Sequence, residues 1–137
     1  MKNKVIILGG HGENDSLNGL MRGYIPLFET RGFGVFYYDL SNPSWDKQQL
    51  FQLLQSKEVL LALTYLGFGQ NLSIVTEENS PPKNIWEFFE VPLLKWQGDI
   101  PAYLPDRHVS NPKNSIRKFL LPASNHFIDV TTCFKKY

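Results

Sequence analysis

The sequence predicts a single α/β domain with a Rossmann-like parallel sheet of about five strands flanked by helices. Residues 4–8 form a short apolar run rich in β-branched side chains, which is typical of a central parallel strand buried on both faces. Glycines follow this run directly, and an amphipathic segment then leads to a second apolar run at residues 34–40. The order strand, helix, strand over this length indicates a βαβ unit, the building block of such a sheet.

The first predicted helix spans residues 15–31, where apolar side chains recur at helical spacing. Asp15 or Ser16 is suited to cap its N-terminus. Pro26 lies inside this span, so we expect the helix to kink or end early there. Gly32 is the expected C-terminal stop.

The remaining elements follow the same alternation with less regularity. Ser44 is expected to cap a helix over residues 45–55 whose leucines share one face, and a third strand follows at 59–66. The later predictions are a strand or short helix at 71–78, a short helix capped by Asn84 and ending at Phe89, a fourth strand at 93–97, an irregular loop at 100–113, a fifth strand at 118–121, and a last helix at 125–135.

Bulk composition fits one domain over residues 1–137, with 42% hydrophobic and 20% charged residues. The net charge of +1 is not clustered, which argues against nucleic acid as the main partner. Cys133 is the single cysteine, so an internal disulfide is excluded and a cysteine-based metal site is disfavoured. Neither a signal peptide nor a membrane span is recognisable, and we expect a cytoplasmic protein, with peripheral contact to a membrane left open.

The turn Gly9-Gly10-His11-Gly12 is the first candidate site, because ligands of parallel α/β sheets bind beyond the carboxyl ends of the strands. Glycines let a ligand approach the backbone, so Gly10, Gly12 and Glu13 are predicted to contact substrate. His11 is a candidate general base, since imidazole titrates near neutrality. The turn matches neither the dinucleotide fingerprint nor a P-loop, and a tight turn that merely needs glycine is the alternative.

A second candidate site follows the fourth predicted strand. Asp99 comes at the carboxyl end of that strand, and Tyr103, Arg107 and His108 follow within ten residues in a proline-constrained loop. Together they offer an acid, a base, a cation and a stacking surface, although a purely structural loop is the alternative. Asn125, at the start of the last predicted helix, is a further candidate for substrate binding at the same edge, or simply a helix cap.

Two stretches resemble the N-terminal domain of bacterial glycosyltransferases with the GT-B fold. The glycine turn with His11 is followed by a helix and by Arg-Gly-Phe-Gly-Val at residues 31–35, where the family carries His in place of Phe33. Residues 93–103 also resemble the family, with a strand that runs into Asp-x-Pro and then into the loop with Arg107.

The resemblance implies that this domain binds a sugar or glycan acceptor. A C-terminal domain, absent from this chain, would bind the nucleotide-sugar donor, so the domain alone would be inactive and would hold no cofactor or metal. It also implies that His11 is the acceptor-side base, with Asp99 as its rival.

Other classes of function remain open from the residues alone. The main alternative is a stand-alone flavodoxin-like module that binds a ligand or regulates a partner without catalysis. A hydrolase is disfavoured, since no Gly-x-Ser-x-Gly nucleophile motif is present. Asp39, at the end of the second strand, could bind a ribose or could form a turn.

Overall fold

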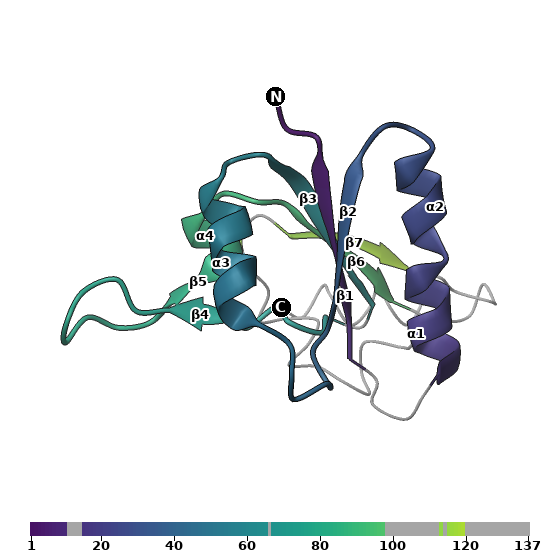
Figure 1. Ribbon diagram of the computed structural model, residues 1–137. Helices are drawn as coiled ribbons and strands as arrows, with labels where there is room; N and C mark the ends of the chain where they lie inside the picture. The colour runs from purple at the N-terminus through teal and green to yellow at the C-terminus, as the bar shows by residue number, and fades with distance from the viewer. Residues whose placement is uncertain (11–14, 66, 98–112, 114, 120–137) are drawn as a thin grey trace.

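A computed structural model describes residues 1–10, 15–65, 67–97, 113 and 115–119. It confirms an α/β fold built on a parallel sheet, with helices on both faces (Figure 1). The strands of the sheet run in the order β2-β1-β3-β6-β7. Their bounds are β1 Lys4–Gly9, β2 Gly34–Asp39, β3 Val59–Tyr65, β6 Leu93–Gln97 and β7 Ser115–Phe119.

Every neighbouring pair in this sheet is parallel, so the carboxyl ends of all its strands lie at one edge. We call this the carboxyl edge and the opposite one the amino edge. β1 is an interior strand, with Leu8 paired to Tyr38 of β2 on one side and to Thr64 of β3 on the other. Gly10, which follows β1, therefore lies at the carboxyl edge between the ends of β2 and β3.

Two helices cover each face of the sheet (Figure 1). α1 Asp15–Arg22 and α2 Tyr24–Glu29 lie on one face, and α3 Lys47–Gln55 and α4 Ile85–Phe88 lie on the other. β1 is buried from both sides, because Ile6 and Leu8 pack in the α3/α4 layer while Val5 and Ile7 pack with Met21 of α1. This two-sided burial confirms the expectation from its continuous apolar run.

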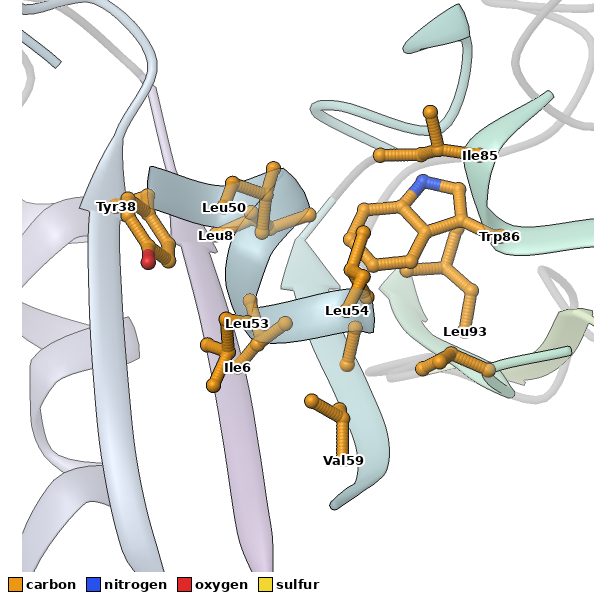
Figure 2. Close-up of a cluster of buried hydrophobic side chains, with 12 residues drawn as sticks. Ile6, Leu8, Tyr38, Leu50, Leu53, Leu54, Val59, Ile85, Trp86 and Leu93 are labelled. Atoms are coloured by element: carbon orange, nitrogen blue, oxygen red, sulfur yellow. The ribbon is translucent and has the colours of Figure 1, made fainter. Parts of the chain in front are cut away.

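The α3/α4 layer holds the larger core (Figure 2). Leu50, Leu53 and Leu54 of α3 are buried against it, as their common helical face predicted. Trp86 of α4 is fully buried in the same layer, whereas its neighbour Phe88 is 44% exposed. α4 is one short turn, so it buries Trp86 on one side and leaves Phe88 on the other.

The first predicted helix is two helices, and the break comes earlier than expected. α1 ends at Arg22, and Gly23 precedes α2, so that Pro26 falls in the first turn of α2. Proline has no N–H to donate to the carbonyl four residues earlier, which is that of Arg22, so the helical ladder is interrupted there. Gly32 does end this region, with a left-handed φ of 86°.

The cap of α3 also differs from the prediction. Asp46, not Ser44, accepts a hydrogen bond from the backbone N–H of Gln48 at 2.8 Å. Ser44 instead donates its hydroxyl to Asn42 at 2.7 Å, inside the preceding turn. Helix α3 therefore begins at Lys47, two residues after the predicted start.

In the second half of the chain, β4 Ser73–Ile74 pairs antiparallel with β5 Lys83–Asn84, which resolves the open choice at residues 71–78 in favour of a strand. Asn84 caps α4 as predicted, accepting from the N–H groups of Trp86 and Glu87. β6 has its predicted bounds, and β7 begins three residues before the predicted fifth strand. The last predicted helix, and Cys133 in it, lie outside the described residues. Among the helices that are described, none has the length and apolar character needed to cross a bilayer.

Candidate functional site at the carboxyl edge

Gly10, after β1, and the loops that follow β2 and β3 meet at the carboxyl edge. The N–H of Leu40, after β2, donates to the carbonyl of Gly9 at 3.1 Å. A Cβ at Gly10 would lie 3.4 Å from Leu40 and from Phe68, which belongs to the loop after β3. A Cβ at Gly69 would lie 2.9 Å from Leu40 and 3.0 Å from Leu8. The φ of 77° at position 69 and the closeness of Leu40 and Leu8 both favour glycine there.

Asn18 of α1 fastens the glycine turn to the sheet. It is 3% exposed, and its side-chain oxygen accepts from the N–H of Gly10 at 3.3 Å and from the Tyr37 hydroxyl at 3.4 Å. The Tyr37 side chain covers Gly9 closely, since a Cβ there would lie 2.1 Å from the hydroxyl oxygen. Gly9 is thus needed for packing under Tyr37, while Gly10 borders Leu40 and Phe68.

Burial and the neighbouring charges together raise the pKa of the Tyr37 phenol. Burial raises its pKa above the ordinary value of 10.0, the nearby Arg22 guanidinium lowers it, and the Asp39 carboxylate raises it. Arg22 lies over the Tyr37 ring, 5.2 Å from its centroid. A neutral phenol donates a hydrogen bond to Asn18, and Arg22 places a cation beside the glycine turn.

The loop after β3 packs over a buried lysine side chain of β6. Lys95 of β6 is fully buried, and its ammonium donates to the side-chain oxygen of Gln70 at 2.5 Å. Thr64, which is paired with Lys95 in the sheet, donates its hydroxyl to the carbonyl of Phe68 at 2.8 Å. A Cβ at Gly67 would come within 3.2 Å of the Lys95 side chain. Burying a charge is costly unless polar groups surround it, so this loop is shaped around the lysine.

Three further hydrogen bonds fix the same loop to α4 and its cap. The indole N–H of Trp86 donates to the carbonyl of Gly69 at 2.8 Å, and the Asn84 amide donates to the carbonyl of Gln70 at 2.6 Å. The N–H of Ile85 donates to the carbonyl of Leu72 at 3.0 Å. A surface segment held this way is preorganised, which is what a binding loop requires.

Of the predicted site residues, the structure describes only Gly10, and it places this glycine at the carboxyl edge as expected. β6 ends at the same edge, at Gln97. Asp39 forms a turn, because its carboxylate accepts from both the N–H and the hydroxyl of Ser41. The other predicted site residues lie outside the described residues: His11, Gly12, Glu13, Asp99, Tyr103, Arg107, His108 and Asn125.

Sequence reasoning missed the polar residues that organise this edge, namely Asn18, Tyr37, Gln70 and Lys95. A lysine inside the apolar strand 93–97 is a usable signal, since lysine is almost never fully buried without partners. Asn18 and Tyr37 carry no such signal, because a polar residue on a helix and a tyrosine in a strand are both common at partly exposed positions.

The described side chains include no group of three or more histidine, cysteine, aspartate or glutamate residues that could hold a metal ion. Comparison with known proteins yields no family. No family model matches the sequence, and no curated protein or solved structure matches it significantly.

Proposed function

We propose that this chain is a ligand-binding α/β domain, with its ligand at the carboxyl edge between Gly10 and the loop that follows β3. The observation that carries the proposal is the strand order β2-β1-β3-β6-β7. The chain moves outward from β1 to β2 and then crosses back to β3 on the other side of β1. Such a reversal creates a switch point, where open parallel sheets bind their ligands.

The same order supports the finer class of the fold. Counted within the sheet, it is 2-1-3-4-5, which is the flavodoxin-like order. The Rossmann order would place the third strand beyond the second, whereas β3 pairs with β1 here. The described topology therefore favours a flavodoxin-like binding module, the alternative left open by the sequence, over a dinucleotide-type domain.

Local chemistry supports a small polar ligand with hydroxyl or phosphate groups. Arg22 is exposed and lies over the ring of Tyr37, whose hydroxyl shares Asn18 with the Gly10 N–H, so a cation is available at this edge. The loop carrying Gly69 is held from below by Trp86, so it does not need ordering on binding.

Titration of the isotope-labelled chain with flavin mononucleotide, a nucleotide-sugar and a disaccharide tests the site. A ligand of this edge shifts the amide resonances of Gly10, Leu40 and Gly69. Arg22→Gln should weaken a phosphorylated ligand about fivefold, as expected for one screened ion pair. The matched Arg31→Gln change, before β2 at the amino edge, should not. Shifts confined to residues far from this edge, for any bound probe, would remove the proposal.

A second proposal is that the domain is the acceptor-binding half of a bacterial glycosyltransferase and works in the cytoplasm. What favours it is a glycine turn between a central strand and a helix, at the edge where the acceptor would bind. The partner would be a second domain that holds the nucleotide-sugar donor. In a protein containing both domains, His11→Ala should lower turnover by about 100-fold if His11 is the base, and near-normal turnover would dismiss it from that role.

A further inference from the structure

A second hollow lies at the amino edge, across the sheet from the carboxyl edge. It has a volume of about 410 Å³, within the range of small-molecule pockets. Its apolar wall comes from the end of α3, the start of β3 and the segment after α4, and includes Leu54, Val59, Val91 and Phe89. Leu54 and Val59 also belong to the buried cluster drawn in Figure 2. The hollow therefore borders the hydrophobic core.

Phe88 forms one side of this hollow while 44% of its surface stays exposed. Its ring meets that of Phe89 edge to face, with centroids 4.9 Å apart. A large exposed aromatic beside a hollow offers a surface on which another ring can stack.

Three charged side chains line the same hollow, namely Lys2, Lys57 and Glu90. Within the described part of the chain, none of them has a side-chain hydrogen bond or an ion pair, although Lys4 and Glu58 nearby are paired with each other. Two unpaired cations against one anion leave a net positive rim around an apolar pocket.

Lys57 and Glu90 also share an unusual backbone conformation. Each follows the last turn of a helix with a left-handed φ, 60° for Lys57 and 56° for Glu90. Glycine is the usual residue at such positions, because side chains there are strained. Helix-end electrostatics favour a cation after α3, but they do not favour the glutamate after α4. Both residues end their helices, and the bonds from the N–H groups of Glu90 and Val91 to the carbonyls of Glu87 and Trp86 close the end of α4.

We propose that this hollow binds a small carboxylate with an aromatic body, whose ring lies against Phe88 and whose carboxylate lies between Lys2 and Lys57. The apolar wall accounts for the body of the ligand, and the two lysines account for its charge. Glu90 disfavours a second negative charge, so the site is for monocarboxylates. This site is separate from the carboxyl edge and does not depend on the function proposed there.

Three probes with one body and different head groups test the charge preference on the full chain: 3-phenylpropionate, 3-phenylpropanol and 3-phenylpropylamine. We expect 3-phenylpropionate to shift the amides of Lys57 and Glu90, to bind about fivefold more tightly than the alcohol, and to leave the amides of Gly10 and Gly69 unchanged. Equal or tighter binding of the amine, or no shift at this hollow with 3-phenylpropionate at 10 mM (roughly the weakest binding that such a probe reports), would overturn the proposal.

Variants separate the contributions of the rim and the ring. Lys57→Asn keeps a residue that tolerates the left-handed conformation, so it should preserve the fold and weaken 3-phenylpropionate about fivefold. Phe88→Ala should weaken all three probes, and Glu90→Gln should strengthen the carboxylate alone. Lys47→Gln, outside this hollow, is the matched control and should change nothing. Unchanged affinity in both Lys57→Asn and Phe88→Ala would also overturn the assignment, while shifts at Gly10 would still support the carboxyl-edge site.

Discussion

Replacing Gly9 by alanine tests the packing that holds the glycine turn on the sheet. The added Cβ would lie 2.1 Å from the Tyr37 hydroxyl oxygen, 2.8 Å from its Cζ and 3.0 Å from the Asn18 side-chain oxygen. Real atoms do not approach so closely, so the Tyr37 ring must move and its 3.4 Å hydrogen bond to Asn18 is lost. Overpacking of this kind costs about 2 kcal/mol, which for a chain of this size lowers Tm by roughly 6 °C.

Thermal and urea unfolding of four variants measure this effect. Gly19→Ala is the matched control, because its Cβ would meet nothing within 4 Å on helix α1 and alanine should stabilise the helix by about 1 kcal/mol. Tyr37→Phe removes the atom nearest to the new methyl group, so the double variant with Gly9→Ala should recover about 1 kcal/mol relative to the sum of the single changes. Strict additivity, or a Gly9→Ala protein as stable as the original, would refute the reasoning.

Three further predictions concern the rest of the chain. Lys95→Met leaves the buried Gln70 side-chain oxygen without its hydrogen-bond donor and should lower the free energy of unfolding in urea by about 1–3 kcal/mol. Adding Gln70→Leu to the same chain should restore part of that free energy. An unchanged free energy of unfolding would show that the lysine does not hold the loop. Asn84→Ala removes the N-cap of α4 and the hydrogen bond to the Gln70 carbonyl, so it should lower the free energy of unfolding by about 1–2 kcal/mol. A change below 0.3 kcal/mol, roughly the error of the measurement, would contradict the capping role. The hydrogen bond from Lys4 lowers the pKa of Glu58 from its ordinary 4.5. The stabilising contribution of this carboxylate is therefore present above pH 4.5 and is lost as pH falls through the lowered pKa. Glu58→Gln should reduce the urea midpoint more at pH 7 than in acid below pH 4.5, and an equal reduction at both would exclude this origin.

The elements that followed from sequence are those whose signal is local. β6 has its predicted bounds because an apolar run lies between a proline and a glycine, and Asn84 caps α4 because asparagine competes well for free N–H groups. The break between α1 and α2 was expected but misplaced, since proline interrupts the ladder at the carbonyl four residues before it and not at its own position. Asp46 and not Ser44 caps α3, because the Ser44 hydroxyl donates its hydrogen bond to the Asn42 side chain.

In the candidate site, too, the sequence predicted what depends on neighbouring residues and missed what depends on distant ones. Glycines after a central strand indicate a turn at the carboxyl edge, and Gly10 lies there. The partners of that turn are Asn18 from α1 and Tyr37 from β2, which are 8 and 27 residues farther along the chain than Gly10, and nothing in the local pattern links them.

From the amino-acid order alone came the α/β class, the parallel strands and the glycine turn, because hydrophobic period and turn chemistry act over a few neighbouring residues. Only the tertiary structure decided the strand order, since the local sequence does not say whether β3 pairs with the free edge of β1 or with that of β2. It also decided that Lys95 is buried beneath the loop of Gln70, and that Lys2, Lys57 and Glu90 surround one hollow. Contacts between distant segments depend on how the layers pack, and that information is distributed over the whole chain.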